Sequence, residues 1–236
     1  MKNTYKRILL KLSGEGLMGN QPCGVDEDRL NIFAESIKKV YDKGISLCVV
    51  IGGGNFFRGI NNKNKSIDRS VADQAGMLAT VMNALFLKGA LLAKGVSAEI
   101  LSGLAVPQAV ETYSYRYAQK LLENKTVIIF AGGTGNPYFT TDTGATLRAL
   151  ETRCDVLCKA TQVDGVYDSD PKKNPKAKRY SQVSYDEVIA KELKVMDMTA
   201  ISMARDNNLP IIVFKQEDED SLLRVLEDKA NYTLIK

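Results

Sequence analysis

The stretch TVIIFAGGTGNPYFTTDT, residues 126–143, decides the fold class of this chain. It opens with the apolar run Thr126 to Ala131, which predicts a short buried strand. A glycine-rich loop follows, and then a helical pattern in which Leu147 and Leu150 stand among alanines, so that Thr140 precedes the expected helix. A strand, a glycine-rich turn and a helix in this order indicate an α/β protein.

The loop between that strand and that helix has the composition of an anion-binding loop. Gly132, Gly133 and Gly135 allow backbone amides to approach a phosphate, while threonine and asparagine side chains supply hydrogen bonds. The free amides of the helix N-terminus would face the same pocket. An ordinary strand-to-helix connection also uses these residue types, so the loop alone does not separate the two interpretations.

Other apolar runs predict further buried strands, with helical patterns between most of them. The strands are expected at Ile8–Leu12, Ser46–Ile51, Ala98–Leu101, Val156–Ala160 and Ile211–Phe214. The helices are expected from an Asp26 cap to Gly44, and over Val71–Lys94, Glu111–Glu123 and Ser184–Leu193. This alternation predicts a mostly parallel sheet with helices on both faces. Because the sequence has neither an internal repeat nor a flexible linker, residues 1–236 are expected to form a single domain.

Two more glycine-rich turns follow predicted strands, KLSG at residues 11–14 and GGGN at residues 52–55. Ligands of such sheets bind beyond the carboxyl ends of the strands, so the three turns should meet at one edge. Lys11 ends an apolar strand and needs an anionic partner, either a phosphate or an acidic residue such as Glu15. The expected convergence of three loops favours phosphate.

The remaining polar residues near these turns suit phosphoryl transfer. Arg58 in GGGNFFRG can bind phosphate oxygens through two hydrogen bonds. No GxxxxGK[ST] pattern occurs, and the consecutive glycines fit a dinucleotide-binding GxGxxG motif poorly. The carboxylates Asp73, Asp142, Asp170 and Asp197 are candidates for metal or hydroxyl binding, or are helix-terminal and turn residues.

Composition narrows the chemistry and the setting. The chain has no histidine, which excludes imidazole-based triads and metal sites and leaves oxygen-bound Mg²⁺ as the expected metal. Phosphoryl transfer needs positioning and charge neutralisation more than a strong base. The net charge of +4 is mild, so nucleic acid is not an expected partner. No signal peptide pattern precedes Lys6 and the apolar runs are too short or interrupted for a bilayer, which predicts a cytoplasmic protein without membrane contact.

Motifs in order along nearly the whole chain resemble those of the bacterial uridylate kinase family, within the amino acid kinase superfamily. They are KLSGE at Lys11, VVIGGGNFFRG at Val49, DQAGMLATVMN at Asp73, GGTGNPYFTTDT at Gly132, KATQVDGVYDSDP at Lys159 and KELKVMD at Lys191. The resemblance implies the amino acid kinase fold, a three-layer α/β/α sandwich, assembled as a homohexamer. It also implies transfer of the γ-phosphoryl group of ATP to UMP, with Mg²⁺ accompanying ATP.

The same resemblance implies the site residues. The implied catalytic residues are Lys11, Arg58 and Asp142, the aspartate organising the basic groups around the transferring phosphoryl. The implied ATP-binding residues are Lys11, Leu12, Ser13, Gly14, Gly54, Arg58, Thr161, Tyr167 and Asp170. The implied UMP-binding residues are Gly53, Asp73, Thr134, Gly135, Asn136, Pro137, Tyr138, Phe139, Thr140 and Thr141. Among these, Asp73 would accept hydrogen bonds from ribose hydroxyls, and Thr134 and Asn136 would meet the uracil edge.

Regulation and two rival functions stay open. The segment GNQPCG, comprising Gly19, Asn20, Gln21, Pro22, Cys23 and Gly24, matches the loop through which many family members respond to GTP. Its sequence differs from the common versions, which leaves GTP activation open, whereas inhibition by UTP at the UMP site is expected. The rivals are another phosphotransferase of the superfamily and a nucleotide-sensing regulator that binds DNA through Lys172 to Arg179. The long helix over Val71–Lys94 fits either a subunit interface or a buried core.

Overall fold

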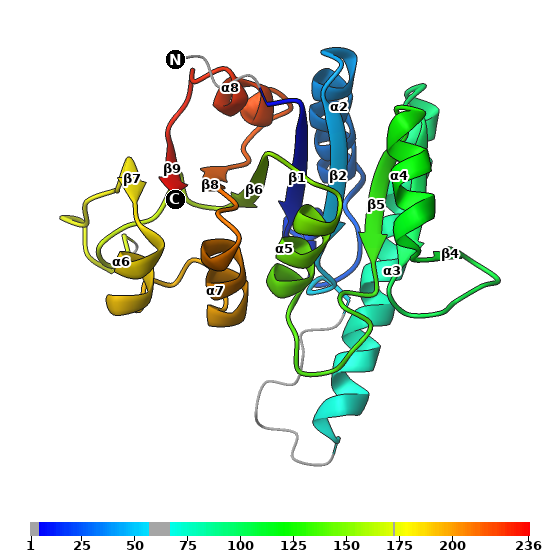
Figure 1. The fold of residues 1–236 in the computed structure, drawn as a ribbon, viewed down its shortest axis with the longest axis horizontal. Coiled ribbons are helices and arrows are strands. Elements are labelled where there is room, and N and C mark those ends of the chain that lie inside the picture. The colour runs from blue at the N-terminus through cyan, green and yellow to red at the C-terminus, as the bar shows by residue number, and fades with distance from the viewer. Residues whose placement is uncertain (1–4, 57–66, 172) are drawn as a thin grey trace.

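The computed structural model describes residues 5–56, 67–171 and 173–236 (Figure 1). Within these residues the strands form one sheet in the order β4-β3-β5-β2-β1-β6-β8-β9-β7. The strands are β1 (Arg7–Leu12), β2 (Ser46–Ile51), β3 (Ala98–Ser102), β4 (Glu111–Thr112), β5 (Val127–Ala131), β6 (Val156–Thr161), β7 (Gln182–Val183), β8 (Ile211–Lys215) and β9 (Tyr232–Ile235). Every pairing is parallel except that of β8 with β9, so the expected mostly parallel sheet is confirmed.

Helices cover both faces of the sheet. They are α1 (Gly14–Met18), α2 (Glu27–Asp42), α3 (Arg69–Ala93), α4 (Tyr115–Glu123), α5 (Thr141–Glu151), α6 (Tyr185–Ala190), α7 (Met198–Asp206) and α8 (Ser221–Leu226). One core joins the sheet to buried residues of α2, α3 and α8, and the other joins it to α4, α5, α6 and α7. The molecule is therefore the three-layer α/β/α sandwich that the resemblance implies (Figure 1).

The central strands are apolar because both of their faces are buried. In β1, Ile8, Leu10 and Leu12 enter the first core while Leu9 enters the second. Successive side chains of a strand point to opposite faces, so a strand between two helical layers needs an almost continuous apolar run. This run ends at Lys11 and Leu12, where the strand reaches the edge that carries the glycine-rich turns.

Some predicted elements differ from the structure. Glu111 and Thr112 belong to the edge strand β4, and the helix expected from Glu111 begins only at Tyr115, after Ser114 in the N-cap position. The polar β4 strand gives no apolar signal because both of its residues are exposed. The expectation that no apolar run could span a bilayer is also wrong by length and composition, because α3 has 25 residues and an 18-residue window within it has a mean hydropathy of 1.6. In the structure, α3 packs against α2, β3 and β5 as a sheet-covering helix.

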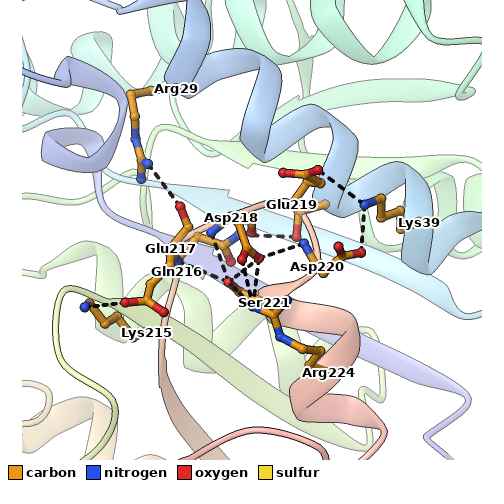
Figure 2. A network of polar contacts seen from close by, with 11 residues as sticks. Arg29, Lys39, Lys215, Gln216, Glu217, Asp218, Glu219, Asp220, Ser221 and Arg224 are labelled. Carbon is orange, nitrogen blue, oxygen red and sulfur yellow. Dashed lines mark hydrogen bonds and ion pairs between the residues drawn. The ribbon is translucent and has the colours of Figure 1, made fainter.

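The acidic run Glu217 to Asp220 is part of a polar network between β8, α8 and α2 (Figure 2). Asp218 accepts from Arg224 Nη2 at 2.8 Å, and Asp220 accepts from Lys39 Nζ at 2.7 Å. Gln216 lies beneath this network, is 7% exposed, and donates to the carbonyl oxygen of Asp218. The acidic run is therefore held by specific basic partners, and these contacts join the segment before α8 to α2.

Candidate active site

The three glycine-rich turns meet at the carboxyl edge of the sheet, as expected. A Cβ atom on Gly14 would lie 2.5 Å from the carbonyl oxygen of Gly52 and 2.7 Å from the amide nitrogen of Gly54, so the first two turns touch. A Cβ atom on Gly52 would lie 3.7 Å from Thr141 Oγ1, so the third turn reaches the second. Glycine is required at Gly14 because a side chain there would overlap backbone atoms.

A cluster of two lysines and one aspartate lies where these turns meet. Lys11 Nζ is 2.8 Å from Asp142 Oδ1, and Lys159 Nζ is 2.6 Å from Asp142 Oδ2. We call Lys11, Asp142 and Lys159 the lysine–aspartate cluster. Lys11 and Lys159 are register partners on the adjacent strands β1 and β6, whereas Asp142 comes from the first turn of α5. Lys11 therefore pairs with Asp142, the aspartate that the resemblance expects to organise the basic groups; the residues alone suggest a phosphate or an acidic residue such as Glu15.

The electrostatics of the cluster follow from its burial. The side chains of Lys11, Asp142 and Lys159 are only 11%, 14% and 13% exposed. Burial acts to raise the pKa of Asp142, but the charges of Lys11 and Lys159 outweigh it, so this pKa is lowered. Burial lowers the pKa of Lys159; Asp142 opposes this shift and Lys11 adds to it, and the net result is a pKa below the ordinary value. The cluster carries two cations for one anion and can accept a further negative charge.

Two adjoining cavities open on one side of the cluster. The large cavity, of about 550 Å³, is lined by Lys11, Lys159 and the predicted residues Leu12, Ser13 and Thr161. The outer cavity, of about 530 Å³, shares Gln162 with it and is lined by Tyr167. Pro171 lines the outer cavity as well, so the chain position of Asp170 is beside it. The structure thus brings the predicted ATP-binding residues of β1, β6 and the following loop to one continuous hollow.

A separate small cavity of about 260 Å³ lies beside the start of α5. Its walls include predicted UMP-binding residues, namely Gly53, Asp73, Phe139, Thr140 and Thr141, and also the predicted ATP-binding residue Gly54. Thr140 and Thr141 directly precede Asp142, so the small cavity adjoins the segment that carries the aspartate of the cluster, while both lysines line the large cavity. Gly54 also faces Glu15, because a Cβ atom on it would lie 3.3 Å from Glu15 Cγ.

The rest of the loop lies next to the small cavity but does not line it. Thr134 and Asn136 hydrogen-bond to each other: the backbone amide nitrogen of Asn136 donates to Thr134 Oγ1 at 3.2 Å. The backbone amide of Tyr138 donates to Asp73 Oδ2 at 2.7 Å, and Tyr138 has φ of 71°. Arg69 stacks on the Tyr138 ring at 4.6 Å from its centroid. Thr134, Gly135, Asn136, Pro137 and Tyr138 are thus the predicted UMP-binding residues that the structure leaves outside the cavity wall.

Buried amides hold the second glycine-rich turn in place. Asn55 and Asn83 exchange hydrogen bonds of 2.7 and 2.9 Å, and Asn83 Nδ2 also donates to the carbonyl oxygen of Gly52 at 2.7 Å. Asn55 Nδ2 donates to the carbonyl oxygen of Gly24, at the end of the predicted GTP-responsive segment. Gly19 and Asn20, at its start, line the large cavity. The segment at residues 19–24 is therefore attached to the candidate site at both of its ends.

Arg58, a predicted catalytic and ATP-binding residue, lies outside the described residues. Lys159 is a functional position that the motifs and turns do not predict, although it has the same sequence signal as Lys11: a lysine near the end of an apolar strand. The cost of burying a lysine without an anionic partner is the signal that identifies both residues.

The side chains of the candidate site fit Mg²⁺ only together with the phosphates of a bound nucleotide. Among the described residues, no three acidic or cysteine side chains come together as a metal-binding group. Mg²⁺ often binds through one or two carboxylates together with substrate phosphates. The residues present therefore fit an ion that arrives on nucleotide phosphates better than an ion held by the protein alone.

The chain is similar to known proteins along nearly its whole length. Residues 6–215 match the model of the amino acid kinase family. The chain is 52% identical over 231 residues to the uridylate kinase of Rickettsia prowazekii, covering 98% of this chain and 96% of the relative. Among solved structures, the UMP kinase of Ureaplasma parvum superposes with a TM-score of 0.94 at 39% identity, covering 98% of each chain. The UMP kinase of Bacillus anthracis superposes with a TM-score of 0.95 at 38% identity, covering 98% of this chain and 96% of that one.

Proposed function

The chain belongs to the amino acid kinase family, and we propose that it is a UMP kinase, which transfers the γ-phosphoryl group of ATP reversibly to UMP and yields ADP and UDP for pyrimidine nucleotide synthesis. The observation that carries this proposal is the lysine–aspartate cluster at the meeting point of three glycine-rich turns: its two lysines line a large cavity, and its aspartate follows two residues that line a small one. Two cavities that both adjoin a cationic group suit a donor and an acceptor that meet there.

We assign ATP to the large and outer cavities. Lys11, Leu12, Ser13, Gly14 and Thr161 would surround its phosphates, and Tyr167 and Asp170 would lie toward the nucleoside. Lys159 joins this set, since it lines the large cavity beside Lys11. Gly54 and Arg58 stay in the proposal as further phosphate contacts, and residues 19–24 as the segment through which GTP would act.

We assign UMP to the small cavity and its loop. The predicted UMP-binding residues Asp73, Thr140 and Thr141 line this cavity, and Thr134 to Tyr138 belong to the same loop beside it. Asp73 would bind ribose hydroxyls, and Thr134 and Asn136 would exchange their mutual hydrogen bond for bonds to the uracil edge. UTP would inhibit by occupying the same cavity.

In the proposed reaction, the cluster neutralises charge without covalent chemistry. Lys11 and Lys159 would bind the oxygens of the transferring phosphoryl group, and Asp142 would keep both ammonium groups apart and aimed at it. Lys159 has two of its three donors occupied among the described residues, by Asp142 and by the carbonyl oxygen of Val195 at 2.5 Å. The third can reach a phosphate oxygen. Mg²⁺, when bound with ATP, would add neutralisation of the phosphate charges.

The lowered pKa of Lys159 predicts the alkaline limb of the activity profile. A lysine whose folded-state pKa lies below 10.5 keeps its charge only at pH values below that lowered pKa, and loses it as the pH rises through it. We therefore expect kcat of the wild-type enzyme to decrease as the pH rises, and to begin this decrease before the pH reaches 10.5. In Lys159→Arg the guanidinium stays charged, so kcat should be lower overall but its alkaline limb should move to higher pH. An unshifted limb in kcat–pH profiles would exclude Lys159 as its source.

Asp73→Asn should raise the KM for UMP about tenfold or more with little change in kcat, because hydrogen bonds from ribose hydroxyls to a carboxylate are stronger than those to an amide. The amide oxygen of Asn can still accept from the Tyr138 amide, so the loop keeps its attachment. Asp68→Asn is the matched control, since Asp68 caps the same helix and asparagine caps as well. Initial rates at varied UMP concentrations decide; an unchanged KM would remove Asp73 from the acceptor site.

We further propose that the chain acts as a single domain within a homohexamer, and that α3 supplies a contact between subunits. The outer side of α3 exposes Leu78, Met82, Leu85 and Phe86 by 42 to 48% each. Met82, Leu85 and Phe86 line a shallow apolar cavity that α2 completes with Leu30. A contiguous exposed apolar face of this kind supports an interface.

The acceptor is tested with a panel. ADP release from Mg²⁺ATP is measured with UMP, CMP, dUMP, AMP and GMP offered separately at matched concentrations. A strong preference for UMP supports the acceptor assignment, whereas equal use of CMP would refute the uracil contacts and keep the phosphotransferase. Turnover with carboxylate acceptors alone would favour another activity of the superfamily, and nucleotide binding without turnover would favour the regulator.

A further inference from the structure

We propose that Asp197 is a positioning residue for phosphoryl transfer: it fixes the first turn of α5, and through it Asp142, relative to Lys159. The inference rests on the proposed function for its kinetic consequences. Asp197 ends the motif KELKVMD and is one of the four carboxylates that the sequence marks as candidates for metal or hydroxyl binding. Its side chain joins α7, which it caps, to α5, and the two helices lie side by side (Figure 1).

The hydroxyl of Thr140 links Asp197 to the first turn of α5, and all of its hydrogen-bonding positions are used. Thr140 is the N-cap of α5, and its Oγ1 accepts from the backbone amides of Asp142 at 3.1 Å and Thr143 at 3.4 Å. The same hydroxyl donates to Asp197 Oδ2 at 2.5 Å. A hydroxyl has one donor and two acceptor positions, so Asp197 determines how Thr140 is turned toward the helix.

Thr143 provides a second and more deeply buried link. Its side-chain hydroxyl donates to Asp197, 2.9 Å from Oδ1 and 3.0 Å from Oδ2, and the residue is 2% exposed. Asp197 Oδ1 also accepts from the amide of Ala200 at 3.0 Å, which caps α7. One carboxylate therefore binds Thr140, two positions before Asp142, and Thr143, one position after it.

The backbone next to Asp197 holds the other side of the cluster. The carbonyl oxygen of Val195 accepts from Lys159 Nζ at 2.5 Å. Residues 195–197 thus contact Lys159 through a carbonyl and the start of α5 through a carboxylate. Since Asp142 bonds directly to Lys159, the segment closes a ring of contacts around the ion pair. Displacing the first turn of α5 would change the direction of both lysines, and a misplacement of about 1 Å can lower a rate about 10²-fold.

Side-chain length separates positioning from capping. Asp197→Ser keeps a good N-cap for α7 but is too short to reach Thr140 and Thr143 together, whereas Asp197→Asn keeps the reach, because its carbonyl oxygen can accept from Thr140 and its amide can donate to the rotated hydroxyl of Thr143. We expect Asp197→Ser to lower kcat about 10²-fold with KM values for both nucleotides within about threefold, and Asp197→Asn to retain most of kcat. Ser184→Ala, which removes the cap of α6, is the control and should leave kcat unchanged.

Two measurements decide the inference. Amide hydrogen exchange of a peptide covering residues 139–147 should rise about fivefold or more in Asp197→Ser and stay unchanged in Ser184→Ala. In a double-mutant cycle, Thr143→Val should lower kcat in the wild-type background and have little further effect in Asp197→Ser. Unchanged exchange, full activity of Asp197→Ser, or multiplicative losses in the cycle would overturn the inference. If the wild type itself makes no UDP, the proposed function fails, and the exchange measurement still decides the role of Asp197.

Discussion

Lys11→Ala is expected to lower kcat by about 10²–10³-fold, because it removes one of two cations that face the transferring phosphoryl group. Lys11 ends β1 with its ammonium group 2.8 Å from Asp142, on the wall of the large cavity. The acceptor occupies the small cavity in our account, which Lys11 does not line. The KM for UMP should therefore change by less than about threefold.

The control for this prediction is a lysine of equal charge far from the cavities. Lys38→Ala removes an exposed ammonium group that pairs with Asp42 on α2, and it should leave kcat unchanged. Steady-state kinetics with each nucleotide varied in turn separate kcat from the two KM values. A loss of UMP affinity as large as the loss of kcat would contradict the assignment of Lys11 to the transferred group.

Asp142→Asn is expected to lower kcat by about 10²-fold or more and also to destabilise the fold. Asparagine has the shape of aspartate but leaves two ammonium groups, 11% and 13% exposed, without a carboxylate between them. Removing one partner from a buried ion pair costs about 3–5 kcal/mol of unfolding free energy. The substitution thus removes both the alignment of the lysines and the charge that makes their burial tolerable.

The pH dependence gives this second prediction its sign. The pKa of Asp142 is lower in the folded state than its ordinary value of 3.8, so its stabilisation is present above pH 3.8 and is lost as the pH falls through the lowered value. The difference in unfolding free energy between wild type and Asp142→Asn should be large at pH 7 and shrink in acid. Urea unfolding of both proteins at pH 7 and in acid measures this difference, and Asp206→Asn, at an exposed aspartate, is the control. Equal stabilities at pH 7 would show that the cluster does not depend on the carboxylate.

The sequence predicts the central strands well because the physics of a doubly covered sheet is local. Strands such as β2 and β5 need apolar residues on both faces, and this need is visible as continuous runs of valine and isoleucine. The strands β4, β7 and β9 have two to four residues, partly exposed, and carry no such run. The short helices α1 and α8 extend over too few turns to show a helical period.

The site divides in the same way. The glycine-rich turns are readable because a backbone that must approach another backbone excludes side chains, as at Gly14. The partner of Lys11 lies on α5, more than a hundred residues away, and depends on how that helix crosses the sheet. The sequence marks Asp197 only as one of four candidate carboxylates for metal or hydroxyl binding, because its bonds to Thr140 and Thr143 exist only after α5 and α7 have packed together. Long-range pairs of this kind require the fold.

The most direct test is to incubate the purified wild-type chain with Mg²⁺ATP and UMP and to quantify all four nucleotides by chromatography over time. Our account predicts that UDP and ADP appear in equal amounts and that neither forms when UMP is omitted. ADP without UDP, or no product from protein that is folded by circular dichroism, would contradict it.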